Sequence, residues 1–260
     1  MNLHYLFHFI KHYVSATRID VLHSPFVYNL YQSCIAREND KSKYAEIEKL
    51  RIQFKADKRT LFYEDFGASA KSRETTVFKL AHQHLKPARI AQILSRMIAH
   101  YAYQNCLELG TSLGITTNYL AFGSNRTHPI HTIEASQQVQ QIAKEGFAIL
   151  GYDKKIEPHL GTFDEVLPSL LTKVGKLDFL YIDGNHSYEA TLRYFEMCKP
   201  YLQNDSVVVF DDIYWSPGMT KAWEEIKQDK SVQISVDLFF VGMVFFRKEQ
   251  VKEHFQLRIF

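Results

Sequence analysis

Four residues in the C-terminal part of this 260-residue chain have side chains suited to acid–base or metal chemistry. Asp183 directly follows one apolar run, and His186 comes three residues later. Asp211 and Asp212 directly follow the next apolar run. Such runs are typical of buried parallel strands, whose carboxyl ends meet at one edge of the sheet. Three carboxylates gathered there would repel one another, and oxygen-only ligands favour a hard cation, so we expect Asp183, Asp211 and Asp212 to bind Mg²⁺ or a similar divalent ion.

His186 lies in the segment Asp-Gly-Asn-His-Ser-Tyr, which places its imidazole beside the predicted metal. An ordinary imidazole titrates near pH 6.5, so it can accept a proton at neutral pH. General-base help of this kind typically contributes about 10²–10⁴ in rate. We therefore expect His186 and Asp183 to be catalytic. The simpler alternatives, in which the acids cap a loop and a helix and His186 is structural, stay open.

The elements that must position these residues begin near residue 105. Short apolar runs alternate there with helical stretches, at residues 106–109, 129–133, 155–160, 177–182 and 207–210. This alternation predicts an α/β fold, a mostly parallel sheet with helices on both faces. Two closely spaced runs, 232–238 and 240–246, predict a final antiparallel hairpin at the sheet edge.

The first run leads into a loop, Glu-Leu-Gly-Thr-Ser-Leu-Gly over residues 108–114, and then a helix. Glycine at a strand end lets a ligand approach the backbone, and the following helix offers free N–H groups. Ser112 and Ile115 occupy the other two positions of a GxGxxG pattern, which argues against NAD, whereas Glu108 suits a cationic ligand. Glu134 ends the second run, where a carboxylate can accept both hydroxyls of a ribose.

Together, the 108–114 loop, Glu134, the segment Gly-Thr-Phe-Asp at 161–164 and Tyr-Ile-Asp-Gly at 181–184 resemble the class I S-adenosylmethionine-dependent methyltransferases. The resemblance covers roughly residues 88–246. It implies a Rossmann-like seven-stranded sheet of order 3-2-1-4-5-7-6 with the last strand antiparallel. It also implies a methyltransferase domain at 88–260 behind a helical N-terminal extension at 1–87.

The resemblance also implies a set of cofactor-binding residues. Glu108 would lie near the methionine amino group, Glu134 would bind the ribose, and the adenine would lie by Thr162 and Phe163. Ser112 departs from the glycine of many members, although Gly-Thr-Ser is frequent among O-methyltransferases. The full set for S-adenosylmethionine is Glu108, Gly110, Thr111, Ser112, Gly114, Glu134, Ala135, Gly161, Thr162, Phe163 and Asp183.

The acidic residues and His186 are similar to those of the metal-dependent O-methyltransferases. Catechol-type and macrolide-type enzymes have an aspartate after strand four, a base three residues later and an acid pair after strand five. His186 and Asp212 depart from the catechol type, which has lysine and Asp-Asn, and are closer to the macrolide type. The resemblance implies that Mg²⁺ lowers the pKa of a hydroxyl on a small acceptor, His186 takes the proton, and the oxyanion attacks the sulfonium methyl.

Charge and composition narrow the classes of function. The chain has 31 Lys and Arg against 29 Asp and Glu, a net charge of +2, but residues 1–100 carry +7 and residues 101–260 carry −5. Its composition is globular, and its apolar runs and first residues lead us to expect neither a membrane-spanning segment nor a secretory signal. Three widely spaced cysteines predict free thiols in a reducing compartment, so we expect a cytoplasmic protein. Basic residues interspersed with acids argue against nucleic-acid binding, and a homodimer is left open.

The first hundred residues predict helices near 3–14, 25–37, 42–57 and 88–104. An apolar stripe in the first of these is expected to pack on the core. The segment 65–72 would close over the cofactor, and Tyr214 and Trp215 either line the acceptor pocket or pack in the interior. Two other classes of function stay open, a metal-independent methyltransferase of RNA or protein and a cofactor-binding module without turnover.

Overall fold

The structure is a computed structural model that describes residues 3–17, 21–37, 42–64, 72–124 and 128–259. The N-terminal elements are α1 (Leu3–Ser15), α2 (Pro25–Leu30), the π-helical turn η2 (Tyr31–Ile35), α3 (Ala45–Ala56), β1 (Thr60–Tyr63), β2 (Arg73–Thr76), α4 (Val77–His84) and α5 (Ala88–Tyr101). Strands and helices then alternate as β3 (Cys106–Leu109), α6 (Ile115–Gly123), β4 (Ile130–Glu134), α7 (Gln137–Ile149), β5 (Ile156–Leu160), α8 (Phe163–Val174), β6 (Leu177–Ile182) and α9 (Tyr188–Cys198). The chain continues through η3 (Lys199–Tyr201), β7 (Leu202–Asp211), α10 (Pro217–Gln228), β8 (Ile234–Asp237), β9 (Val241–Phe245) and β10 (Glu253–Gln256).

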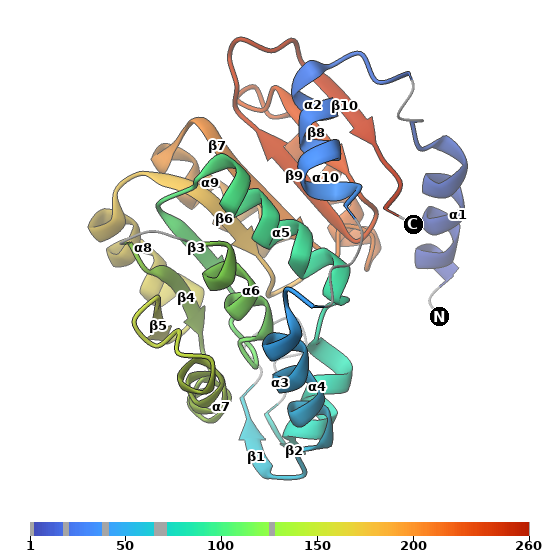
Figure 1. Cartoon of the computed structure of the whole chain (residues 1–260). Coiled ribbons are helices and arrows are strands. Elements are labelled where there is room, and N and C mark those ends of the chain that lie inside the picture. The colour runs from blue at the N-terminus through green and yellow to red at the C-terminus, as the bar shows by residue number, and fades with distance from the viewer. Residues whose placement is uncertain (1–2, 18–20, 38–41, 65–71, 125–127, 260) are drawn as a thin grey trace.

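The main sheet has eight strands in the order β10-β8-β9-β7-β6-β3-β4-β5 (Figure 1). β9 is antiparallel to both of its neighbours, β7 and β8, and the other pairs are parallel. The seven strands from β3 to β9 have the predicted order and the predicted antiparallel last strand. The Rossmann-like methyltransferase topology is therefore confirmed, with one strand more than expected.

The additional strand, β10, pairs in parallel with β8 and forms one edge of the sheet. Its sequence, Glu-His-Phe-Gln, is polar and partly exposed, so it lacks the apolar run that marks a buried strand. The N-terminal segment reaches this edge, because the backbone N–H of Thr17 donates to the carbonyl of Gln256 at 2.7 Å. The two ends of the described chain thus lie near each other (Figure 1).

Helices cover both faces of the sheet, as the apolar runs predicted. One face packs against α5, α6, α7 and the α2–η2 segment, with Phe179, Val209 and Phe245 among its buried strand residues. The other face packs against α8, α9 and α10, with Leu107 and Phe210 among its strand residues. These two layers hold the strand ends in place, and the site is built on those ends.

The N-terminal extension contains elements that the sequence did not predict. β1 and β2 form an antiparallel hairpin, and α4 follows it directly. The backbone N–H of Phe62 in β1 donates to the side chain of Gln138 in α7 at 2.7 Å, which connects the hairpin to the helices that cover the main sheet. All of the predicted closing segment 65–72 except Ser72 lies outside the described residues.

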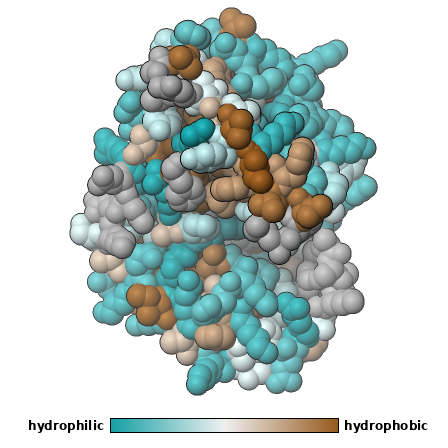
Figure 2. All heavy atoms as spheres, turned by 90° about the vertical axis from the view of Figure 1, so that its right-hand side faces the viewer, coloured by the Kyte–Doolittle hydropathy of each residue, from teal (hydrophilic) through white to brown (hydrophobic). Residues whose placement is uncertain are grey.

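The apolar stripe of α1 does not pack on the core, contrary to expectation. Phe7 and Val14 are 63% and 75% exposed, and Figure 2 shows hydrophobic atoms gathered on the side where α1 lies. The opposite face of α1 docks instead, with His8 stacked on Tyr214 at 4.9 Å between ring centroids. His12 Nε2 lies 3.2 Å from Asp237 Oδ1, so a buried carboxylate and aromatic stacking, and not the aliphatic stripe, orient this helix.

Two further expectations concern cysteines and membranes. The three cysteines, all within the described residues, are buried and form no disulfide. Among the described helices, none has the length and apolar character needed to cross a bilayer.

Candidate functional site

The loop between β3 and α6 is shaped by glycine. Gly110 has φ +104°, and a Cβ placed on it would lie 2.0 Å from the carbonyl oxygen of Asp183. Ser112 and Gly114 also have positive φ values, +48° and +72°. The loop therefore presses against the end of β6, and only a residue without a side chain fits at position 110. The structure brings the predicted cofactor loop and Asp183 together.

Glu108 lies beneath this loop and is fully buried. Its Oε2 accepts hydrogen bonds from the hydroxyls of Thr117 at 2.5 Å and Thr132 at 2.7 Å. Its Oε1 has no hydrogen-bond partner among the described residues. Burial raises the pKa of Glu108 to about 8, although the two hydroxyls oppose the shift. A nearby positive group would restore the charged form, which suits the cationic ligand predicted for this position.

Glu134 is the last residue of β4, and its carboxylate accepts hydrogen bonds from the loops that follow β3 and β4. Its Oε2 accepts from the backbone N–H of Ser112 at 2.9 Å, and its Oε1 accepts from the backbone N–H of Ser136, next to Ala135, at 2.9 Å. The carboxylate thus lies over the glycine loop, at the carboxyl end of its strand. This is the position from which a strand-end acid can reach a ribose.

The loop after β5 and the start of α8 contain the remaining residues predicted to bind the cofactor, Gly161, Thr162 and Phe163. The backbone N–H of Gly161 donates to the carbonyl of Glu134 at 3.0 Å, and Thr162 caps α8 through a capping box with Glu165. Phe163 lies against the backbone of Gly184, where an added Cβ would come within 2.9 Å of the ring. The loops after β3, β4, β5 and β6 therefore converge on one edge of the sheet.

The three predicted metal ligands also meet at this edge. Tyr181 lies fully buried between two of them, and its hydroxyl donates to Asp211 at 3.0 Å and to Asp183 at 3.2 Å. Asp212 has a left-handed backbone, with φ +52°, a conformation that clusters at functional sites. Burial and the neighbouring Asp183 raise the pKa of Asp211 well above its ordinary value. A positive charge beside the cluster would therefore stabilise the ionised form of Asp211.

That charge comes from Lys86, which the sequence analysis missed. Its ammonium forms an ion pair with Asp211 and lies 3.1 Å from Asp212 Oδ2 and 3.3 Å from Asp183 Oδ1. Burial alone would lower the pKa of Lys86, but the three carboxylates outweigh it and raise this pKa well above its ordinary value. Lys86 is therefore a charged ammonium among the three acids that were expected to bind a metal.

The backbone around Lys86 fixes its position. Lys86 lies between α4 and α5 and precedes Pro87, which favours an extended conformation at this residue. Arg51 of α3, itself buried, donates from Nη1 to the Lys86 carbonyl at 2.6 Å and from Nε to Glu48 at 3.0 Å. The hydroxyl of Tyr119 in α6 bonds the same Glu48 carboxylate. A buried polar chain thus ties the lysine to the methyltransferase domain.

His186 lies beside the same cluster. Its Nε2 is 3.6 Å from Asp183 Oδ1 and 3.9 Å from Asp212 Oδ2. Burial lowers the pKa of His186, the two carboxylates oppose this shift, and Lys86 adds to it. The lowered pKa favours the neutral imidazole near pH 7, the form that a general base requires, and the role of His186 as base remains a prediction.

The helix α1 lies near the carboxylate cluster. The pKa of Tyr5 is raised by burial and by the charges of Asp212 and Asp211, which places this helix beside the carboxylates. Tyr214 is buried and donates to Asp237 at 2.5 Å, so it packs in the interior, whereas Trp215 is 58% exposed. Of the two aromatic residues proposed for the acceptor, only Trp215 is accessible.

These observations test the two expected ligands differently. The buried Glu108 Oε1, which has no hydrogen-bond partner among the described residues, fits a bound S-adenosylmethionine held between the loops at Glu108, Glu134 and Phe163. The donor atoms of Asp183, His186 and Asp211 lie within 4.8 Å of one another, a spacing that suits a metal ion. The ammonium of Lys86, however, lies between the carboxylates, so a divalent ion fits there only if this lysine leaves.

Comparison with known proteins agrees with this geometry. Residues 107–213, which include every strand end described above, match a family model described as Methyltransferase domain. The O-methyltransferase hkm8 of Aspergillus hancockii is 32% identical over 128 residues, 48% of this chain and 49% of that protein. The O-methyltransferase imqG of Aspergillus flavus is 34% identical over 87 residues, 32% of this chain and 35% of that protein. The chain spans about half or less of the length of these curated relatives.

Solved structures share the fold over most of the chain. An O-methyltransferase from Bacillus cereus in complex with SAH has a TM-score of 0.57 at 18% identity, covering 84% of this chain and 97% of that one. The O-methyltransferase TomG from Streptomyces achromogenes in complex with SAM has a TM-score of 0.58 at 17% identity, covering 84% and 96%. The resemblance to the class I S-adenosylmethionine-dependent methyltransferases is confirmed.

Proposed function

We propose that this protein is an S-adenosylmethionine-dependent O-methyltransferase of a small hydroxylated acceptor. The observation that carries this proposal is the convergence of His186 with Asp183, Asp212 and Lys86 beside the glycine loop. A hydroxyl must lose a proton to become a good nucleophile, and this group offers both a base and a positive charge next to it. The O-methyltransferase relatives support the same class of reaction.

When bound, S-adenosylmethionine supplies an electrophilic methyl group on a sulfonium. Glu108 and Glu134 would hold its amino group and ribose, and Phe163 would lie by its adenine. His186 Nε2 would take the acceptor proton, and the Asp183 and Asp212 carboxylates would stabilise the resulting imidazolium. A small acceptor is favoured because two elements crowd the carboxylates: Tyr5 of α1 senses their charge, and the Trp215 backbone N–H donates to the Asp212 carbonyl at 2.9 Å.

Two versions of the reaction differ in which cation lies among the three acids, a Mg²⁺ ion or the Lys86 ammonium. The sequence predicted Mg²⁺ on Asp183, Asp211 and Asp212, and that remains a prediction. We favour a version in which the Lys86 ammonium takes this part, because it is buried, charged and paired with all three acids. Lys86 would then hold the acid cluster together and stabilise the oxyanion that forms when His186 removes the proton.

Two measurements, cofactor binding and methyl transfer, test the class of function and whether Lys86 or a metal ion supplies the positive charge. Titration calorimetry with S-adenosylmethionine should show binding that Glu134→Ala weakens, and methyl transfer should be detectable with a panel of small phenols and sugars. Turnover should persist in EDTA if Lys86 is the cation, whereas loss in EDTA and recovery with Mg²⁺ would support the metal-assisted version. Transfer to RNA or protein alone would favour a macromolecular acceptor, and an absence of cofactor binding would refute the methyltransferase proposal.

A further inference from the structure

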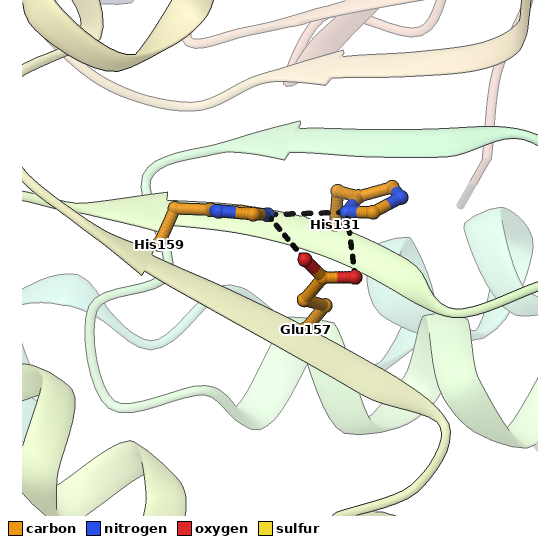
Figure 3. Close-up of side chains that lie close together, drawn as sticks. All are labelled: His131, Glu157 and His159. Atoms are coloured by element: carbon orange, nitrogen blue, oxygen red, sulfur yellow. Dashed lines mark hydrogen bonds and ion pairs between the residues drawn. The ribbon is translucent and has the colours of Figure 1, made fainter. Parts of the chain in front are cut away.

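A second cluster of imidazole and carboxylate groups lies away from the loops described above. Figure 3 shows His131 of β4 and Glu157 and His159 of β5 pointing toward one another. His131 Nδ1 is 3.1 Å from His159 Nε2, and the Glu157 carboxylate is 3.6 Å from the first nitrogen and 3.8 Å from the second. Three potential metal-ligand groups therefore face one small volume.

The register of two parallel strands brings these residues together. His131 pairs with Glu157 and Ile133 pairs with His159, so all three side chains of the cluster lie on one face of the sheet. This is the face of Leu107 and Ile133, which α8 helps to cover. β5 is the free edge of the sheet and contains Pro158, a residue that sheets tolerate at an edge. The cluster therefore joins the edge strand to its only strand neighbour.

The donor atoms of the three residues are close enough together to hold one metal ion. One donor atom from each residue can be chosen so that all three lie within 4.8 Å of one another. A tetrahedral zinc ion with bonds of about 2.0–2.1 Å separates its ligand atoms by about 3.3 Å. The two imidazole nitrogens are 3.1 Å apart, Glu157 Oε2 is 3.6 Å from His131 Nδ1, and Glu157 Oε1 is 3.8 Å from His159 Nε2. A hydrogen bond between the imidazoles accounts for the shortest distance, but the carboxylate is too far from both rings for hydrogen bonds.

We propose that His131, Glu157 and His159 form a binding site for a zinc-type divalent metal ion. Two imidazoles and one carboxylate are a known zinc ligand set, and water would occupy the fourth position. This inference does not depend on the proposed methyltransferase activity, because no residue of the cluster is in the catalytic group.

The lysine beside this cluster, Lys173, differs from Lys86, the lysine among Asp183, Asp211 and Asp212. Lys173, near the end of α8, donates to Glu157 Oε1 at 2.7 Å, and its side chain is 64% exposed. An exposed lysine can swing into solvent at little cost, so it competes with a metal without excluding it. A bound ion would fasten β5 to β4 just before the loops that begin at Glu134 and Gly161.

The test uses the full chain, stripped of metal and titrated with Zn²⁺ against a chromophoric chelator. His159→Ala should lower the affinity of this site by more than about 100-fold, since even outer-shell changes typically cost 10–100-fold. Lys173→Met should raise the affinity, because it removes the competing ammonium. His82→Ala, at an exposed histidine outside the cluster, is the matched control and should change nothing. If His159→Ala does not fold, Glu157→Gln tests the same ligand set.

Location and stability give independent readouts. Anomalous diffraction at the zinc edge should place an ion between His131 and His159, and Zn²⁺ should raise the melting temperature of the wild type but not of His159→Ala. Zinc density only among Asp183, His186 and Asp211 would overturn the proposal. Equal zinc affinity in the wild type and His159→Ala would overturn it as well.

Discussion

The molecule holds two clusters in which carboxylates and imidazoles face one another, and they differ in the cation beside them. At the centre, Lys86 has a side chain only 16% exposed and is paired with three carboxylates. At the sheet edge, Lys173 is 64% exposed and touches one carboxylate from outside. Similar ligand sets can therefore be a closed ion-pair network in one place and an accessible metal site in another.

The difference follows from how each lysine is held. Lys86 lies in a short connection before a proline, and Arg51 fixes its carbonyl, so its ammonium cannot leave without disturbing buried groups. Lys173 extends from the last turn of a surface helix, and Glu157 is its one ion-pair partner among the residues that the structure describes. Charge compensation at the centre is built into the fold, whereas at the edge it is optional. The edge imidazoles also have pKa values lowered by burial, which favours the neutral form that can bind a metal.

The strongest test of this comparison is Lys86→Met. Removing the cation from a buried network leaves its acids uncompensated, so we expect a loss of about 3–5 kcal/mol in the free energy of unfolding. Turnover should fall by about 10²–10³, the usual effect of losing one charge-stabilising group. Urea unfolding and methyl-transfer assays would measure both effects. Addition of Mg²⁺ should partly restore the variant, because the carboxylates then become accessible to an ion.

Lys79→Met is the matched control, because Lys79 is an exposed residue of α4 close in sequence. It should leave stability and turnover near those of the wild type. A Lys86→Met protein that is as stable and active as the wild type in EDTA would mean that Lys86 does not supply the charge.

The second test concerns the base at the centre. His186→Ala should lower the turnover number by about 10²–10⁴ and leave the affinity for S-adenosylmethionine unchanged, because the imidazole is proposed to contact the acceptor and not the cofactor. Calorimetry and single-turnover kinetics separate the two effects. A parallel loss of cofactor affinity and rate would assign His186 a structural role. His159→Ala provides the comparison at the edge cluster, where metal-free turnover should not change.

Asp237, a buried acid outside both clusters, extends the comparison to a carboxylate whose partners are a histidine, a hydroxyl and a backbone N–H. Burial alone would raise the pKa of Asp237, but hydrogen bonds with His12, the Tyr214 hydroxyl and the Phe239 N–H outweigh it and lower the pKa. The resulting stabilisation is fully present above about pH 3.9, the ordinary pKa of aspartate, and is lost as the pH falls through the lowered value. Unfolding in urea at a series of acid pH values should show this loss for the wild type. Asp237→Asn should flatten it, and an unchanged slope would contradict the assignment.

Much of the fold and part of the site could be predicted from the sequence. Buried parallel strands are continuous apolar runs, so β3 and β6 were predicted with the bounds they have in the structure, and the acids at their ends followed. β2 and β10 were missed because they are short, polar and partly exposed, and β1 was missed because its four residues, although mostly apolar, are only partly buried. Polar strands of this kind depend on their neighbours more than on their own pattern.

Lys86 could not be found from local sequence, because it lies 125 residues from Asp211 and belongs to no motif. Only the charge distribution pointed toward it. A basic first hundred residues and an acidic remainder indicate that cations from the N-terminal part compensate acids of the methyltransferase domain, and Lys86 does so. The edge cluster was missed for a related reason, since His131 and Glu157 become neighbours only through the register of β4 and β5.

The smallest expected effect is the most direct comparison between the two lysines. Lys173→Met, measured without metal, removes an exposed ion pair, so its cost in unfolding free energy should be at most about 1 kcal/mol, well below that of Lys86→Met. Both changes remove one ammonium from a carboxylate, and only the depth of the site and the number of acids differ. Urea unfolding of both variants in EDTA gives the two values side by side. Equal costs would mean that burial of the lysine does not distinguish the two clusters. Lys86 could then not be assigned as a permanent counter-charge, nor the cluster beside Lys173 as an accessible metal site, on the basis of burial.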